Sequence, residues 1–326
     1  MSATSRLGWT LLAAGPNALW SLATGARRRA LVLAYHRCLG GAETFVAPDQ
    51  GYVTAAQLER QLRFVLKRRR PLLFGELATR ADDGPYVAVT FDDGYRDVFD
   101  VARPILARLG VPATLFVASD AVSGRAWLWW DRLYRVLARG VGQEFELAGR
   151  VWRLEDDRAV GRAYRALLAE LKRSEARDQT IATVERRLGD AGVAPGNLYL
   201  GWPEVRELKR DGWEIGAHGQ NHQILTALPA RDARADVAAG ADDIACYVGE
   251  RPRVFAYPNG RPGDFDAATA EFLRAEGFVA AATMVGGFAR ADRDPFRVRR
   301  LVPKGWDAAG VFALQTSGLY YKLKGS

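Results

Sequence analysis

The sequence predicts an α/β protein whose parallel sheet closes into a distorted (β/α) barrel of about seven strands. Short apolar runs, rich in β-branched residues, alternate with segments in which apolar residues recur at helical spacing. This alternation of strand and helix is typical of parallel sheets and barrels. A stretch at about residues 121–200 interrupts the alternation, and we interpret it as a helical insertion.

The first part of the chain is predicted to contain strands at 31–35, 87–91 and 113–117. Thr54 and Gln57 are spaced as a capping box, which predicts the start of a helix that ends near residue 70. After the second strand, apolar residues continue at helical spacing to Leu109, and Gly110 ends that helix.

The insertion is predicted to be mainly helical, and the alternation resumes after it. Within it we expect an aromatic helix at about 127–137, a hairpin at 144–154, and two charged helices between 156 and 188. Such an excursion from a rigid scaffold could shape a substrate groove. The later helices are predicted from Pro203, at 230–247, at 265–275 and from about Trp306, and the later strands at 213–217, 254–257, 278–282 and 296–302.

Two adjacent acids, Asp92 and Asp93, end the strand at 87–91 and are followed by Gly94, which lets the backbone turn. Catalytic and binding groups collect at this edge of α/β sheets. Because adjacent side chains on a strand point to opposite sides, we expect one acid to bind a metal and the other to handle protons. The alternative is a polar turn that caps the next helix.

The chain has three histidines, and each follows a predicted strand. His36 follows the first strand, and His218 and His222 follow the strand at 213–217. A pair spaced four residues apart faces one way on a helical turn, which suits two imidazoles that share one ion. Their common position at strand ends, beside a pair of acids, favours a metal centre.

Three motifs, in order along the chain, resemble those of the polysaccharide deacetylase family, the chitooligosaccharide deacetylase-like carbohydrate esterases. They are Thr90-Phe91-Asp92-Asp93-Gly94, His218-x-x-x-His222 and Phe255-Ala256-Tyr257-Pro258-Asn259-Gly260. The resemblance covers roughly residues 30–120 and 200–303, and the layout is most similar to poly-N-acetylglucosamine deacetylases. It implies the same barrel and metal-dependent hydrolysis of the N-acetyl group of an amino sugar, in a polysaccharide such as an exopolysaccharide or in a lipid-linked glycan.

The resemblance also implies roles for individual residues. Asp93, His218 and His222 would be the ligands of a divalent metal, with zinc favoured and Co, Ni, Fe or Mn as alternatives. Asp92 would be the base that takes a proton from metal-bound water. The oxyanion would be bound by the metal and by the backbone N–H of Tyr257, aimed by the turn at Pro258.

Several positions depart from the family's pattern. No histidine follows His222, where many members carry the acid of a Leu-x-His motif, so we expect His36 to be the general acid. A structural role at the strand end is its alternative. Gly219 stands where the family often has Ser or Thr, so this loop could be less braced. Phe255 replaces an arginine, and Arg299 or Arg300 is expected to orient Asp92 instead.

Composition limits the partners and the location. The net charge is +8, but no nucleic-acid motif accompanies it, so nucleic acid is not an expected partner. We divide the chain into an N-terminal segment at 1–29, which would suit a helix lying on a membrane surface, and a barrel at 30–326. Cys38 and Cys246 are expected to be free thiols in a reducing compartment. We therefore expect a cytoplasmic, membrane-associated protein, and a periplasmic location stays open.

Two other functions stay open at this point. One is hydrolysis of a non-sugar amide or cyclic ureide on the same barrel; exposed aromatic residues in a groove would favour sugar instead. The other is an inactive barrel that binds glycan, against which the presence of both acids and all three histidines argues.

Overall fold

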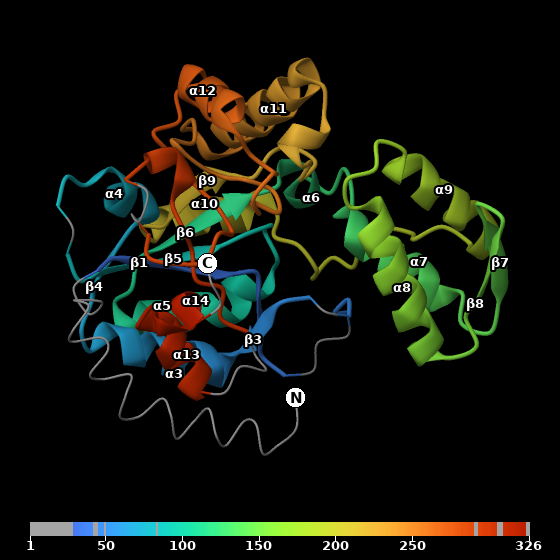
Figure 1. Ribbon diagram of the computed structural model, residues 1–326, viewed down its shortest axis with the longest axis horizontal. Helices are drawn as coiled ribbons and strands as arrows, with labels where there is room; N and C mark the ends of the chain where they lie inside the picture. Colours follow the sequence, from blue (N-terminus) through green and yellow to red (C-terminus); the bar gives the residue numbers. More distant parts are fainter. Residues whose placement is uncertain are drawn as a thin grey trace.

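A computed structural model of the chain describes residues 29–41, 45–48, 50–82, 84–289, 293–304 and 309–323. Within these residues, seven parallel strands form one curled sheet in the order β1-β5-β6-β9-β10-β11, with β4 paired to the start of β5 (Figure 1). The strands are β1 (Leu31–Tyr35), β4 (Arg70–Leu72), β5 (Tyr86–Phe91), β6 (Ala113–Val117), β9 (Glu214–Ala217), β10 (Val254–Ala256) and β11 (Ala280–Ala282). The predicted α/β class and distorted barrel are confirmed.

The gap between β11 and β1 is filled by irregular chain rather than by a strand. Val298 forms an isolated bridge with Ala282 of β11, and Leu301 forms one with Leu33 of β1. Two backbone hydrogen bonds of 2.8 Å flank the second bridge. The predicted strand at 296–302 is therefore wrong, because this segment divides its pairing between two different strands and has no continuous ladder with either.

The two faces of the sheet are packed with side chains of different size. In β1 and β5, residues such as Leu33 and Val89 belong to a core shared with the surrounding helices, whereas Val32 and Ala88 belong to a core inside the barrel. Because strand side chains alternate, the inward face of β5 continues through Thr90 to the end of the strand. This alternation decides which acid of the Asp-Asp pair enters the barrel.

Helices surround the sheet, and α3 begins at the capping box of Thr54 and Gln57 that the sequence predicts. The helices outside the insertion are α3 (Ala55–Leu66), α4 (Phe74–Thr79), η2 (Val98–Ala102), α5 (Arg103–Leu109), α10 (Trp202–Arg210), η3 (Leu225–Ala227), α11 (Ala230–Val248), α12 (Ala267–Ala275), η4 (Pro295–Arg297), α13 (Ala309–Thr316) and α14 (Leu319–Leu323). Two short strands, β2 (Arg37–Leu39) and β3 (Tyr52–Thr54), form a separate parallel pair.

The predicted insertion lies to one side of the barrel and has an apolar core of its own (Figure 1). Its elements are α6 (Ser119–Val122), α7 (Trp129–Arg139), β7 (Glu144–Leu147), β8 (Arg150–Arg153), α8 (Asp157–Leu171) and α9 (Arg177–Leu188). The returning chain is attached to the loop after β5: Leu200 N donates to Gly94 O at 2.9 Å, and Arg96 N donates to Leu198 O at 3.0 Å. The insertion is thus joined to the barrel directly beside the Asp-Asp pair.

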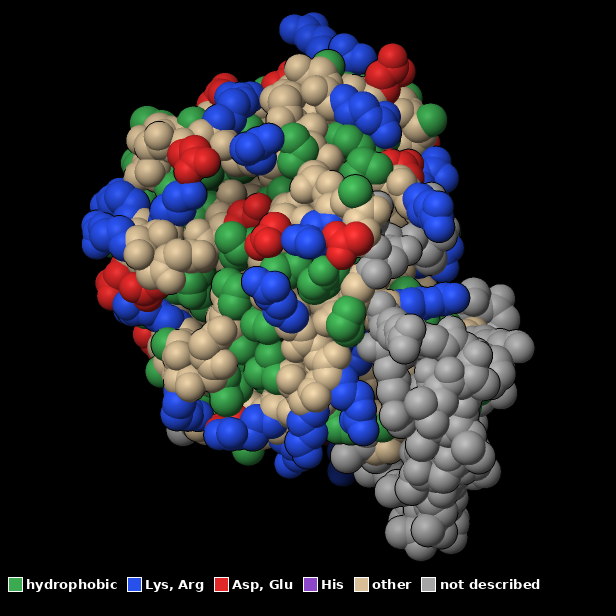
Figure 2. Space-filling view, turned by 90° about the vertical axis from the view of Figure 1, so that its left-hand side faces the viewer, with side chains coloured by type: hydrophobic (Ala, Val, Ile, Leu, Met, Phe, Trp, Pro, Cys, Tyr) green, Lys and Arg blue, Asp and Glu red, His purple; other side chains and the backbone are tan. Residues whose placement is uncertain are grey.

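Several predictions concern the ends and the surface of the chain. Residues 1–28 of the predicted N-terminal segment lie outside the described residues, as do 305–308, where the last helix was expected to begin. Among the helices that are described, none has the length and apolar character needed to span a membrane. On the face far from the insertion, basic side chains stand in separate groups with acidic ones among them (Figure 2).

Candidate active site

Asp92 enters the barrel interior from the end of β5 and meets a buried arginine. The guanidinium of Arg300 donates to both carboxylate oxygens of Asp92, from Nη1 at 2.8 Å and from Nη2 at 2.7 Å. Arg300 is fully buried and is also bonded to the Thr283 carbonyl oxygen at 2.9 Å. Burial alone would raise the pKa of Asp92, but Arg300 outweighs burial and holds it well below its usual range. Asp92 is therefore held ionised and in one orientation.

The two-point contact that was expected of Arg299 or Arg300 is thus made by Arg300. Arg299 instead lies against the backbone of Gly287. Both arginines lie on the irregular segment that closes the barrel, and Arg300 is the one whose side chain is directed inward.

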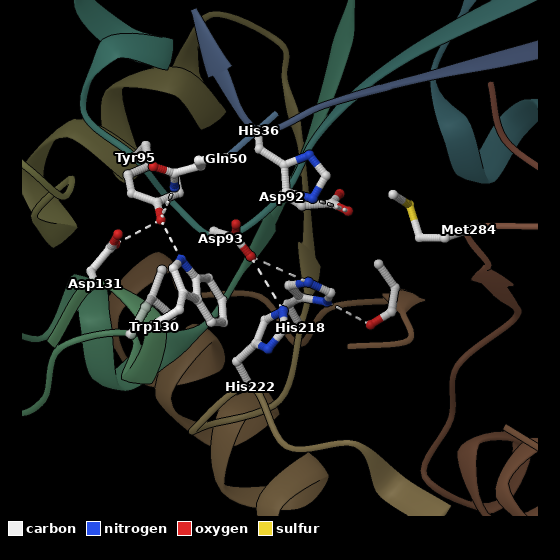
Figure 3. A network of polar contacts seen from close by, with 12 residues as sticks. His36, Gln50, Asp92, Asp93, Tyr95, Trp130, Asp131, His218, His222 and Met284 are labelled. Carbon is white, nitrogen blue, oxygen red and sulfur yellow. Dashed lines mark hydrogen bonds and ion pairs between the residues drawn. The ribbon is translucent and has the colours of Figure 1, made fainter. Parts of the chain in front are cut away.

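Asp93 turns away from the strand because its backbone adopts φ 78°, in the left-handed region, just before Gly94 at φ 98°. Its carboxylate faces both histidines of the pair: Asp93 Oδ1 lies 3.5 Å from His218 Nε2 and 3.4 Å from His222 Nε2 (Figure 3). Oδ1 is buried, and no described residue forms a hydrogen bond with it. Three groups that can bind a cation thus converge on one point.

The histidine pair lies on a loop and not on the helical turn that the i, i+4 spacing suggested. Gly219 and His222 both have positive φ, 75° and 52°, which no helix contains. The buried carboxylate of Asp236 holds this loop by accepting the N–H groups of Gln220 at 3.2 Å and Asn221 at 2.9 Å. The helical prediction is wrong because these local bonds replace the helical ones.

Glycine at 219 has a physical reason here. A Cβ at this position would lie 2.3 Å from Asp236 Oδ2. The loop is braced from the opposite side by Asp236, so the expectation of a less braced loop is wrong. Sequence reasoning missed Asp236. The signal for it was its position as a polar residue on the otherwise apolar face of α11.

The cluster of Asp93, His218 and His222 fits a divalent metal ion. Their donor atoms all lie within 4.8 Å of one another. Two ligands of a tetrahedral zinc ion lie about 3.3 Å apart, close to the two oxygen–nitrogen distances in this cluster. His218 Nδ1 donates to the carbonyl oxygen of Ala256 at 2.7 Å, which leaves the lone pair on Nε2. Burial lowers the pKa of His222 to about 3, which favours the neutral form that a ligand must have.

His36, directly after β1, lies on the other side of Asp92 from this cluster (Figure 3). Its Nε2 is 4.0 Å from Asp92 Oδ2, and its side chain is 25% exposed. The structure thus brings His36, Asp92 and the three-residue cluster together, with His36 accessible from the cavity that they line.

Tyr257 lines the same cavity, but its backbone cannot play the predicted role. Tyr257 N donates to the carbonyl oxygen of Ala282 at 3.0 Å, because the pairing of β10 with β11 continues one residue past the strand. The predicted oxyanion contact through this N–H is wrong. Pro258 begins the turn that follows, in which Gly260 N donates to Pro258 O at 2.7 Å.

A second set of polar residues beside the site was missed from the sequence. Trp130 of α7 places its ring against His222, and its Nε1–H donates to the hydroxyl of Tyr95 at 3.0 Å (Figure 3). The Tyr95 hydroxyl in turn donates to Asp131 at 2.7 Å and is bonded to Gln50. Trp130, in the aromatic helix that the sequence predicts for the insertion, thus forms part of the wall of the site.

One cavity of about 450 Å³ lies at the carboxyl edge of the sheet, and both acids, all three histidines, Trp130 and Tyr257 line it. Its walls come from both the barrel and the insertion. The lining residues are His36, Pro48, Gln50, Asp92, Asp93, Trp129, Trp130, Tyr164, Arg165, Leu168, Ala169, Lys172, His218, His222, Ile224, Tyr257, Asn259, Arg261 and Met284.

The fold and the site place the chain among α/β-barrel proteins with acids and histidines at the carboxyl edge of the strands. Residues 79–281, more than half of the chain, match the family model of the polysaccharide deacetylases. The chain belongs to this family, as the motifs suggested, and family membership assigns it to the deacetylases of glycans. No curated protein matches the chain.

Solved structures share the fold at low sequence identity. The deacetylase PplD of Streptococcus pyogenes, in complex with acetate, has a TM-score of 0.56 and 16% identity, over 89% of this chain and 98% of that one. IcaB of Ammonifex degensii has a TM-score of 0.54 and 20% sequence identity, over 88% of this chain and 97% of that one. The deacetylase domain of BpsB from Bordetella bronchiseptica has a TM-score of 0.51 and 18% sequence identity, over 83% of this chain and 94% of that one.

Proposed function

We propose that the protein removes the N-acetyl group of an amino sugar in a polysaccharide or lipid-linked glycan, with a divalent cation held by Asp93, His218 and His222. The observation that carries the proposal is the shared cavity. The three-residue cluster, the ionised Asp92 and the accessible His36 all line it, so a single acetamide group can reach every one of them.

The reaction adds water to an amide and releases acetate and an amine, which takes up a proton at neutral pH. A divalent ion in the cluster supplies Lewis acidity, which polarises a carbonyl group and lowers the pKa of water. Asp92, fixed by Arg300, accepts a proton from the attacking water. His36 donates a proton to the departing nitrogen, which must leave as an amine. Zinc suits the donor set of one carboxylate and two imidazoles.

The cavity wall supports a sugar substrate over a small non-sugar amide. Trp129, Trp130, Tyr164 and Tyr257 all line it. Aromatic rings supply large apolar faces with polar edges, which match the apolar and hydroxyl-bearing surfaces of a pyranose ring.

The test is acetate release from N-acetylglucosamine oligomers. We expect release by zinc-loaded protein, loss of release after chelation, and recovery when zinc is restored. Asp92→Asn and His36→Gln should each lower kcat at least about a hundredfold, as removal of a proton-transfer group does. Asp100→Asn, which alters an exposed carboxylate on η2, serves as the matched control and should retain full activity.

Zinc binding by the wild type without acetate release would overturn the deacetylase proposal in favour of a non-sugar amide or a glycan-binding barrel. Release that persists in Asp92→Asn would contradict its assignment as base.

A further inference from the structure

The cavity has a basic side that the reaction itself does not use. Arg165 of α8, Lys172 directly after α8, and Arg261 in the loop after β10 all line it. Among the described lining residues, the only acids are Asp92 and Asp93, and both already have partners in the site. Neither of these acids pairs with Lys172 or Arg261.

The buried acid nearest in sequence to Arg261 is Asp264, and its carboxylate is already occupied. Its Oδ1 accepts from the Arg173 guanidinium, and its Oδ2 accepts from the side-chain amide of Asn259 and, at 3.0 Å, from the backbone N–H of Arg261. Arg173 therefore supplies the counter-charge of Asp264. The guanidinium of Arg261 and the ammonium of Lys172 form no ion pair with any described residue.

The same contacts fix the relative position of the two cations. Arg173 Nη2 lies 3.3 Å from the Gly263 carbonyl oxygen and 3.3 Å from Thr226 Oγ1, so the end of α8 is held against the loop that carries Arg261. Burial and the positive charge of Arg261 together lower the pKa of Lys172. Two like charges thus act on each other here, and Asp264, the acid that also acts on Lys172, is already paired with Arg173, so an anion that joins the two cations would be favourable.

We propose that Lys172 and Arg261 form an anion subsite at the edge of the cavity, which binds a phosphate or carboxylate group of the glycan close to the acetamide that is cleaved. This inference rests on the proposed deacetylase function and names its substrate class, an anionic N-acetylated glycan. Phosphate and uronate share the chemistry that two adjacent cations recognise.

The basic side also has a consequence for the product. Each deacetylation replaces a neutral acetamide by an ammonium group, which Lys172, Arg261 and Arg165 repel. A glycan that already carries several free amines should bind poorly. The enzyme is thus suited to isolated acetyl groups beside an anion, and not to extensive deacetylation of a neutral homopolymer.

Binding tests the subsite separately from turnover. Zinc-supplied Asp92→Asn protein would be titrated with two matched pairs of probes, read by the fluorescence of Trp129 and Trp130. One pair is N-acetylglucosamine 1-phosphate and N-acetylglucosamine; the other is a hyaluronan tetrasaccharide and a chitin tetrasaccharide. We expect at least one anionic probe to bind about tenfold more tightly than its neutral partner, as a charged hydrogen bond provides. The pair that shows the difference distinguishes phosphate from carboxylate.

Adding Lys172→Gln and Arg261→Gln together should abolish this preference, and adding Lys67→Gln, an exposed lysine directly after the far helix α3, should leave it intact. No preference in either pair, or a preference that survives the double substitution, would overturn the subsite. Acetate release from the chitin tetrasaccharide by otherwise wild-type protein is measured separately. The same measurement is made with N-acetylglucosamine 1-phosphate and the hyaluronan tetrasaccharide. Absence of release from all three would count against the deacetylase, whereas release without an anion preference would count against the subsite alone.

Discussion

Trp130 packs edge-on against His222, with ring centroids 4.6 Å apart and ring planes at 76°. Trp130 belongs to the insertion and His222 to the barrel, so this contact joins the insertion to the predicted metal cluster. The N–H of the indole is fixed in turn by Tyr95, two residues after Asp93.

Trp130→Ala should lower zinc affinity about tenfold, as loss of a residue that orients a ligand commonly does. Trp130→Phe keeps a ring edge beside His222 and should stay near the wild type. Affinity would be measured by competition with a chelating dye. Trp152→Ala, which also removes a buried insertion tryptophan but not one beside His222, is the control. Equal losses in Trp130→Ala and Trp152→Ala would mean that only the stability of the insertion matters.

Arg300→Lys should lower kcat by about ten- to a hundredfold, because lysine keeps the charge but cannot make the two-point contact with Asp92. Zinc affinity should not change, since Arg300 does not touch the three-residue cluster. Steady-state kinetics and the same dye competition separate the two quantities. Arg299→Lys alters the neighbouring residue outside this contact and should be close to the wild type. A loss of zinc affinity in Arg300→Lys would show that its effect is not confined to Asp92.

Gly219→Ala should destabilise the protein more than Gly142→Ala. Both glycines have positive φ, 75° and 83°, but a Cβ at 142 meets no atom within 4 Å, whereas one at 219 approaches Asp236 Oδ2. Gly142→Ala, the control, should therefore lower the free energy of unfolding by about 1 kcal/mol because of backbone strain. Gly219→Ala should lower it by about 1–3 kcal/mol more because the added Cβ displaces the loop. Urea unfolding measures both. Equal costs would rule out a bracing role for Asp236.

The contribution of Asp131 to stability should fall as the pH rises from about 4 to 7, because burial raises the pKa of its carboxyl to about 7. In the unfolded chain this carboxyl titrates near its ordinary value, about 3.9. The folded state thus binds the proton more tightly, and the stabilisation is complete below about pH 4 and is lost as the pH rises through 7.

Asp131→Asn tests this directly, because the amide oxygen can still accept from the hydroxyls of Tyr95 and Tyr199 but the side chain no longer titrates. Urea midpoints of chelated protein at pH 5 and pH 7.5 should differ less in the variant than in the wild type. Identical differences would assign the pH dependence to other groups.

The sequence was sufficient to predict the parts of the fold that depend on local pattern. Apolar runs located β1, β5, β6, β9, β10 and β11, and a capping box located the start of α3. The acids and histidines were predicted to meet because the carboxyl ends of parallel strands share one edge. The site roles assigned to them stay predictions.

What escaped prediction depends on contacts between distant residues. The loop of His218 and His222 is shaped by Asp236, and the Tyr257 N–H is used by Ala282; neither partner is visible in a local window. Trp130 and Lys172 lie in a segment without family motifs, so nothing in the sequence linked them to the cavity. The segment at 296–302 has the sequence pattern of a strand, but it pairs with two strands in turn and forms no continuous ladder with either.

The pairing of Asp92 with Arg300 spans 208 residues of sequence. During synthesis, Asp93, His218 and His222 all leave the ribosome before Arg300 is added to the chain, so the three residues proposed to bind the metal can assemble while Asp92 still lacks its cation. The gap between β11 and β1 is filled only when residues 298–301 pack into it. This closure between residues far apart in the sequence comes late because it carries the greatest loss of chain entropy. Chain completion therefore also completes the charge balance around Asp92, and a chain that stops short of residue 298 would carry the cluster without a fixed acid beside it.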